Sequence, residues 1–410
     1  MSRSTRPLLI VVGGTDPVYR GYCVKQAAAA YPIALIDSKP PSWQQHLVVD
    51  HEVADTHDPA AVVAAGLALA ARHPIAGVVT WDEYTLVPSA ELAARLGVPG
   101  NSAAAMTACR DKATSRRLFA EHNVPSATST RVGILAEATA AALRTGFPVV
   151  LKPSSHAASI GVVRVDTPEG LPAAWEFAAT GAGEQGPEGS GVLVEEYLSG
   201  PEISVECVTQ HGVTTALAVT REEVAFPPYF EEVGHTVDAG DPLLPEVAPV
   251  AVQAVRALGV TAGVQHVEMR LTASGPRIIE VNARIGGDLI GTLVRLATGL
   301  DLPRIAGDVA CGKVPDLTPT AHATAAIKML YPPATGILSA QDLAIVPGPK
   351  YPWLHQVTWL RDVGERVVLP PTGKLDTGRV GFLIVTADSP AAARDRLSLL
   401  ADGLTLSVTP

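Results

Sequence analysis

A polar hairpin at residues 264–288 limits what this chain can fold into more than any other segment. Two strand-like runs flank a turn at Thr272–Pro276, and side chains alternate between the two faces of a strand. One face of each run is polar: His266, Glu268 and Arg270 in the first, Glu280, Asn282 and Arg284 in the second. The opposite face of the second run is apolar and is expected to enter a core: Ile279, Val281 and Ala283.

The polar face has the chemistry of a metal and phosphate site. Carboxylates and an amide carbonyl suit a hard cation, and a guanidinium suits a phosphoryl oxygen. We therefore expect Glu268, Glu280 and Asn282 to hold Mg²⁺, or Mn²⁺ in its place, against phosphate. The alternative, a solvated charged face, fits less well because apolar sequence flanks the hairpin and Gly286–Gly287 ends it.

Composition limits the class of protein. A chain of 410 residues is too long for one core, so several domains are expected. The net charge of −10 argues against binding to nucleic acid or to an anionic membrane. The longest apolar stretch, Ala60–Ala71, is too short to span a bilayer. Four widely spaced cysteines without a CxxC motif are typical of reduced thiols, so we expect a cytoplasmic protein.

The first hundred residues alternate short apolar runs with Ala-rich helical stretches, a pattern that predicts βαβ units and a parallel sheet. Expected strands are 8–12, 33–36, 46–49 and 77–80, and expected helices are 24–30, 59–72 and 86–96. Gly13–Gly14 follows the first strand without a full GxGxxG motif. Trp81–Asp82–Glu83 follows the last strand, at the edge where ligands bind, so Glu83 is a candidate substrate contact.

The remaining sequence reads as mixed α and β structure. One helix is expected over 105–125, and further helices near 245–258 and 288–298. Further strands are expected at 148–153, 161–165, 192–197, 203–209 and 215–220. Beyond about residue 315 the pattern suggests a smaller α+β domain. The expected fold class is therefore a multi-domain protein combining α/β and α+β parts.

Two segments before the hairpin carry further candidate residues. Lys152 ends an apolar strand and needs an anionic partner if it is buried. The small, hydroxyl-rich loop 154–162 after it suits a phosphate chain, although Gly161 is its only glycine and His156 is a candidate substrate contact. In the second segment a buried strand runs into Glu195 and Glu196, breaks at 199–201 and presents Glu202.

Together these segments resemble the ATP-grasp superfamily, in the same order along the chain. The resemblance implies an N-terminal pre-ATP-grasp domain (1–105), an ATP-grasp domain (106–315, with a lid at about 125–194 and a central sheet at about 195–315) and a C-terminal α+β domain (316–410). It implies ATP and Mg²⁺ as cofactors. It assigns ATP contacts to Lys112, Lys152, Ser159, Glu195, Glu196, Leu198 and Glu202, with adenine at Glu195 and Leu198 and ribose at Glu202. It assigns the metal to Glu268, Glu280 and Asn282, and the transferred group to Arg284.

Several details look like bacterial L-amino acid ligases, among them GVVTWDEY and the run from Phe230 to His235. That resemblance implies activation of an amino acid carboxylate as an acyl phosphate, attack by the amine of a second amino acid, and release of ADP and phosphate. It implies catalytic roles for Lys152 and Arg284 and a homodimer. The implied substrate contacts are His235, Arg284, Gly286, Gly287, His156 and Glu83. No general base stands out.

Three alternatives share the same motifs. One is another ligase, such as a γ-glutamyl type that activates a side-chain carboxylate or a purine-pathway type. The second is a biotin carboxylase-like subunit, which the glycine-poor loop and the missing biotin site disfavour. The third is an inactive nucleotide-binding protein. An intact set of site residues argues against decay, because unpaired buried carboxylates destabilise a fold. The set is Lys112, Lys152, Glu268, Glu280, Asn282 and Arg284.

Overall fold

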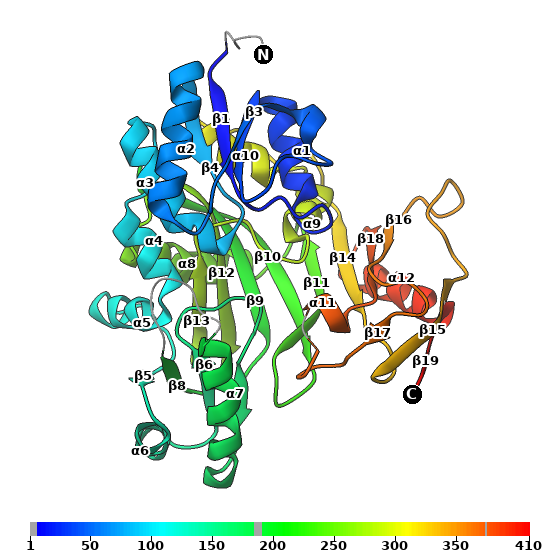
Figure 1. The fold of residues 1–410 in the computed structure, drawn as a ribbon. Helices are drawn as coiled ribbons and strands as arrows, with labels where there is room; N and C mark the ends of the chain where they lie inside the picture. Colours follow the sequence, from blue (N-terminus) through cyan, green and yellow to red (C-terminus); the bar gives the residue numbers. More distant parts are fainter. Residues whose placement is uncertain (1–5, 184–190, 374) are drawn as a thin grey trace.

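The computed structural model describes residues 6–183, 191–373 and 375–410. Its N-terminal part is a parallel sheet in the order β3-β2-β1-β4 with helices on its faces (Figure 1). The elements are β1 (Leu8–Val12), α1 (Gly21–Ala30), β2 (Ile33–Asp37), β3 (Val48–Val53), α2 (Pro59–Arg72), β4 (Ile75–Val79) and α3 (Leu86–Leu96). All five residues of β1 are fully buried, as expected for a strand covered on both faces. The predicted βαβ pattern is confirmed.

The single helix predicted over 105–125 is wrong. Two helices occupy this stretch, α4 (Ala103–Arg110) and α5 (Lys112–Glu121). Asp111 between them has an extended backbone, and its carboxylate accepts a hydrogen bond from the Thr114 amide at 2.7 Å. An aspartate that caps a new helix in this way ends the previous one. Lys112 therefore becomes the first residue of α5.

A small antiparallel sheet forms the next layer, in the order β5-β8-β6-β7. Its strands are β5 (Ser129–Val132), β6 (Val149–Pro153), β7 (Val163–Val165) and β8 (Val192–Glu196). Two helices pack on it, α6 (Leu135–Thr145) and α7 (Leu171–Gly183), and their alanines and leucine share its core. This sheet lies away from the N-terminal sheet, at the other end of the molecule (Figure 1).

A large antiparallel sheet contains strands from residues 202 to 387. Its strand order is β13-β12-β9-β10-β11-β14-β18-β16. Its strands are β9 (Glu202–Gln210), β10 (Val213–Ala225), β11 (Glu231–Asp238), β12 (Gly263–Thr272), β13 (Gly275–Asn282), β14 (Thr324–Leu330), β16 (Leu354–Trp359) and β18 (Gly381–Ala387). Its helices are α8 (Leu244–Ala257), α9 (Ile290–Thr298) and α10 (Leu302–Ala310). Strands from the segment after residue 315 thus continue the sheet that carries the polar hairpin.

The C-terminal segment also builds a small sheet of its own, in the order β17-β15-β19. Its elements are β15 (Gly336–Leu343), β17 (Arg366–Val367), α11 (Leu375–Gly378), α12 (Pro390–Asp402) and β19 (Leu404–Thr409). The mixed α and β structure expected here is present (Figure 1). All four cysteines are free thiols, and no helix in the described parts of the chain has the length and apolar character needed to cross a bilayer.

A β-bulge changes the predicted faces of the hairpin. Glu268 lies opposite Glu280, but Met269 lies opposite Ile278, so Ile279 is an extra residue in β13. Ile278 is fully buried in the core, whereas Ile279 borders a large cavity. The prediction that Ile279 enters the core is therefore wrong. The prediction for Val281, which is fully buried, is confirmed.

A buried charge cluster joins the small sheet to the rest of the molecule. Glu195 at the end of β8 accepts from Arg116 Nε at 2.7 Å and Nη2 at 3.1 Å, and it pairs with Lys152 Nζ at 2.7 Å. Arg116 lies on α5 and also donates to the Ile279 carbonyl of β13 at 2.7 Å. All three charged side chains are buried. Their mutual pairing is what makes burial of these charges tolerable.

This cluster predicts a pH-dependent contribution to stability. Although burial alone would raise it, Arg116 and Lys152 lower the pKa of Glu195 from 4.5 to about 2. A carboxylate with a lowered folded-state pKa stabilises the fold fully above its unfolded pKa, and this stabilisation is lost as the pH falls toward the folded value. The difference in unfolding free energy between the wild type and Glu195→Gln should therefore stay constant above about pH 5 and narrow below it.

Urea unfolding at pH 7, 5, 4 and 3 measures this difference. Glu121→Gln is the matched control, because the pair of Glu121 with Arg117 is at the surface and should add little stability at any pH. A difference for Glu195→Gln that does not change between pH 7 and 3 would contradict the assignment.

Candidate functional site

One cavity of about 650 Å³ lies where the three layers meet. The N-terminal sheet contributes residues at or just after the ends of its strands, such as Gly13, Asp37 and Glu83. The small sheet contributes Lys152 and the loop after it, and the large sheet contributes the hairpin. Segments far apart in sequence therefore form a single site, which we call the central cavity.

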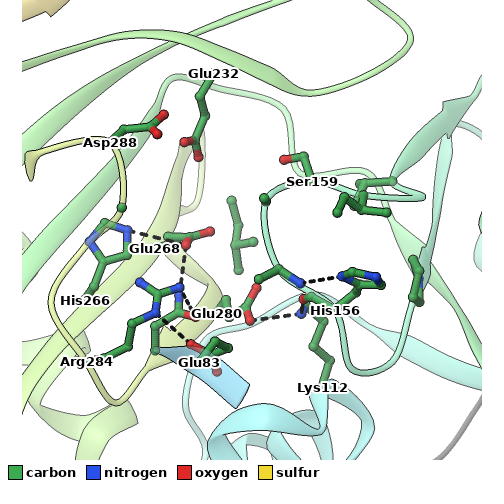
Figure 2. Close-up of a pocket in the computed structure, with 18 of the residues that line it drawn as sticks. Glu83, Lys112, His156, Ser159, Glu232, His266, Glu268, Glu280, Arg284 and Asp288 are labelled. Carbon is green, nitrogen blue, oxygen red and sulfur yellow. Dashed lines mark hydrogen bonds and ion pairs between the residues drawn. The ribbon is translucent and has the colours of Figure 1, made fainter. Parts of the chain in front are cut away.

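Lys112 and Lys152 both reach the central cavity, as predicted. The Lys112 ammonium lies 2.9 Å from a Glu280 carboxylate oxygen and donates to the His156 carbonyl at 2.6 Å (Figure 2). Lys152 is held by Glu195. Two buried ammonium groups on one wall suit a polyphosphate, because each can exchange part of its present pairing for a phosphate oxygen.

The predicted metal ligands converge. Glu268 and Glu280 face each other across the β12–β13 pair, and Asn282 donates to Glu268 at 3.0 Å (Figure 2). His266 Nε2 lies 3.4 Å from the same Glu268 carboxylate. Lys112 and His266 thus sit beside the two carboxylates. Oxygen donors of this kind fit Mg²⁺.

Arg284 lies beside these oxygens. Its Nε is 2.9 Å from a Glu83 carboxylate oxygen, and its Nη2 donates to Asn282 at 3.2 Å. Glu83 comes from the loop after β4, so the N-terminal part and the hairpin meet at this ion pair (Figure 2). Nearby carboxylates, Glu83 first among them, outweigh burial and raise the pKa of Arg284. Arg284 therefore stays positively charged in the cavity.

The expected adenine and ribose residues also line the central cavity. Glu195, Glu196, Leu198 and Glu202 all border it. Both oxygens of Glu195 are already bound by Arg116 and Lys152. Glu196 pairs with Arg277, and Glu202 pairs with Arg270. The nucleotide roles of these glutamates remain predictions, and Arg116 is a contributor that the sequence reading missed.

The loop 154–162 closes over one side of the cavity in an unusual backbone conformation. Ala158 and Ser159 have positive φ angles of 58° and 53°. A Cβ at Gly161 would lie 2.8 Å from the Pro153 side chain, which accounts for glycine there. His156 Nδ1 lies 3.0 Å from the Tyr84 hydroxyl, so the loop contacts the N-terminal part. Ser159 and His156 both line the cavity as expected.

Two of the expected substrate contacts lie behind the cavity wall. His235 is buried and is not among the lining residues; its Nε2 lies 3.4 Å from Asp288 and 3.7 Å from Glu232, which do line the wall. Gly286 is also buried behind the wall, where a Cβ would come within 2.9 Å of His266. Gly287 lines the cavity.

Sequence reasoning missed Arg379, Glu232 and Asp288 as cavity residues. Arg379 is buried, pairs with Asp288 at 2.7 Å and donates to the Glu232 carbonyl at 3.0 Å. Asp288 directly follows Gly286–Gly287, and Glu232 lies in the run from Phe230 to His235, so both were adjacent to noted motifs. No pattern in the sequence around Arg379 indicates that it lines the cavity. Its segment reaches the cavity only because β18 joins the large sheet.

Comparison with known proteins agrees with this geometry. Residues 145–292 match the ATP-grasp domain family. Human carnosine synthase 1 is 30% identical over 256 residues, which cover 58% of this chain and 31% of that protein. The alanine–anticapsin ligase of Bacillus subtilis is 28% identical over 263 residues, 58% of this chain and 55% of that protein. The chain thus spans only part of the length of these two relatives.

A solved structure matches the whole chain. The L-amino acid ligase from Bacillus licheniformis superposes with a TM-score of 0.80 at 21% identity, covering 100% of both chains. The expected fold class, with a parallel N-terminal sheet and antiparallel sheets after it, is confirmed. Residues 145–292 therefore match an ATP-grasp domain, and the whole chain has the fold of the L-amino acid ligase.

Proposed function

We propose that this protein is an ATP- and Mg²⁺-dependent ligase that joins the carboxylate of one amino acid to the amine of another. The observation that carries the proposal is the convergence of Lys112, Arg284 and the oxygen donors of the hairpin in one cavity. The L-amino acid ligase of the same fold and the alanine–anticapsin ligase relative support an amino acid as the carboxylate substrate.

The reaction needs two steps. A carboxylate oxygen of the first amino acid forms a bond to the γ-phosphorus of ATP, and the bond to the ADP oxygen breaks. The amine nitrogen of the second amino acid then attacks the acyl carbon, the acyl–oxygen bond breaks, and phosphate leaves while the nitrogen loses a proton. Each step gathers negative charge on oxygen, so positioned cations and donors lower its barrier.

Different residues of the central cavity would stabilise the charge in these two steps. Lys112 and Lys152 would neutralise the phosphate chain. Glu268, Glu280 and Asn282 would hold Mg²⁺, which when bound draws electron density from phosphoryl oxygens. Arg284, held by Glu83 and Asn282, would bind the carboxylate and later the negative oxygen at the reacting carbon.

Phosphate release provides the direct test. The protein is incubated with ATP, Mg²⁺ and amino acids, singly and in all pairs, and products are identified by mass spectrometry. We expect release that depends on a particular pair, with a product mass equal to the sum of the two amino acids minus water. If no pair of amino acids gives phosphate release although ATP still binds, the proposal is overturned.

Substitution at Arg284 tests the proposed role of this side chain. Arg284→Lys keeps the charge but loses the planar fork that contacts Glu83 and Asn282 together. We expect kcat for phosphate release to fall by about 10²–10³, the usual cost of removing a donor aimed at the transition state. ATP binding measured by calorimetry should remain.

Arg117→Lys provides the matched control, since Arg117 lies exposed on α5 and pairs only with Glu121 among the described residues. It should retain the wild-type kcat. A wild-type kcat in Arg284→Lys would remove Arg284 from the proposed mechanism.

A further inference from the structure

Three carboxylates gather at the ends of adjacent strands of the large sheet. Glu202 begins β9, Glu222 lies near the end of β10 and Glu232 lies near the start of β11. One carboxylate oxygen from each lies within 4.8 Å of the others. We call these residues the acidic triad. Glu202 and Glu232 line the central cavity, and Glu222 stands directly beside them.

The buried carboxyl group of Glu222 has no hydrogen-bond or ion-pair partner among the described residues. Neither of its carboxylate oxygens is accessible to solvent, and neither has a hydrogen-bond partner in the described parts of the chain. Burial, followed by the nearby carboxylates of Glu232 and Glu202, raises the pKa of Glu222 well above its usual range. A buried acceptor left in this state costs free energy unless something binds to it.

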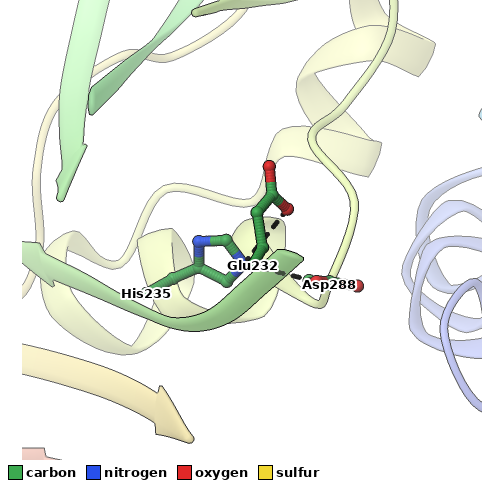
Figure 3. A group of neighbouring side chains, drawn as sticks. All are labelled: Glu232, His235 and Asp288. Atoms are coloured by element: carbon green, nitrogen blue, oxygen red, sulfur yellow. Dashed lines mark hydrogen bonds and ion pairs between the residues drawn. The ribbon is translucent and has the colours of Figure 1, made fainter. Parts of the chain in front are cut away.

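Glu232 is also poorly compensated. Elsewhere in the cavity Glu83, Glu195 and Glu280 each lie within 3 Å of an arginine or lysine nitrogen, and within the triad Glu202 pairs with Arg270. Within the described residues, the only ion pair of Glu232 is with His235 at 3.7 Å (Figure 3). Arg379 donates to the backbone carbonyl of Glu232, but its ion pairs are with Asp288 and Glu231. Among the described residues, Glu222 and Glu232 therefore lack the close cationic partner that Arg270 provides for Glu202.

We propose that the acidic triad binds a side-chain ammonium or guanidinium of one of the two substrates, so that at least one of the joined amino acids is basic. This inference rests on the ligase function proposed above. The geometry of an ammonium group fits this environment. Acceptor oxygens that lie about 2.8 Å from its nitrogen, in tetrahedral directions, stand about 4.6 Å from one another. The oxygens of the triad lie within 4.8 Å of one another.

The acidic triad is too far from the reacting carbon to bind the α-nitrogen of either substrate. The α-nitrogen of the activated amino acid lies about 2.5 Å from its own carboxyl carbon, by covalent geometry. The attacking nitrogen must come within about 3.5 Å of that same carbon. Both therefore belong at Arg284 and the β12–β13 hairpin. Glu222 is on β10, two strands from β12 in the sheet order, about 10 Å away at the usual strand spacing. A long basic side chain spans that distance.

Matched amino acids test the proposal. Phosphate release is measured with lysine, ornithine and arginine, each compared with the uncharged analogue of similar length, norleucine, norvaline and citrulline. Each of these six amino acids is tested in a pair with every other amino acid. We expect kcat/KM for at least one basic amino acid to exceed that of its analogue at least tenfold.

Variants test whether the preference for basic amino acids depends on the acidic triad. Glu222→Gln should reduce the preference for the basic amino acid at least tenfold while the KM for ATP stays the same. Glu223→Gln is the control: it is the same change one residue on, at an exposed side chain that pairs with Lys328. It should keep the wild-type preference. Unfolding temperature measured with ADP and Mg²⁺ gives a readout without turnover, since lysine should raise it more than norleucine in the wild type only.

The outcomes separate the two proposals. Turnover with uncharged pairs but no preference for basic ones would overturn the triad assignment and leave the ligase standing. No turnover with any pair would overturn the ligase, and equal binding of lysine and norleucine would then overturn the triad as well. A Glu222→Gln variant that shifts the KM for ATP, or the Mg²⁺ or K⁺ dependence, without altering the preference would assign the triad to nucleotide or metal and reject the proposal.

Discussion

The pairing of Glu195 with Arg116 and Lys152 is the interaction on which the site depends. It ties Glu195, the penultimate residue of β8, to β6 and α5, and Arg116 continues the connection to the backbone of β13. Each of these elements carries part of the central cavity. Because the charges are buried, the cluster tolerates little displacement, and the small sheet is therefore held close to the hairpin.

The same principle of compensated charge explains the cavity as a whole. Lys112 meets Glu280, Arg284 meets Glu83, and Arg379 meets Asp288. A wall made of paired charges keeps its shape before substrates arrive, so binding requires an exchange of partners and little rearrangement of the backbone. Glu222 and Glu232 depart from this pattern, and for that reason they point to a ligand.

Much of the fold and site could be predicted from local sequence. The alternation of strands and helices before residue 100 gave the parallel sheet, and the period of two gave the convergence of Glu268, Glu280 and Asn282. Local pattern could not show the bulge at Ile279, because a bulge depends on pairing with another strand. Nor could it show Arg379 or the wall in front of His235, which arise from contacts between distant segments. The domain boundaries, the homodimer and the cytoplasmic location stay predictions.

The continuous large sheet gives the C-terminal segment a role beyond packing. Strands β14, β18 and β16 extend the sheet that carries the hairpin, and Arg379 reaches the cavity just before β18 begins. This segment is therefore not an independent module that could be exchanged between relatives while leaving the pocket intact. Any recombination point placed after residue 315 would replace Arg379, which lines the cavity and pairs with Asp288, so changes in this segment and changes in the loop after the hairpin are expected to depend on one another.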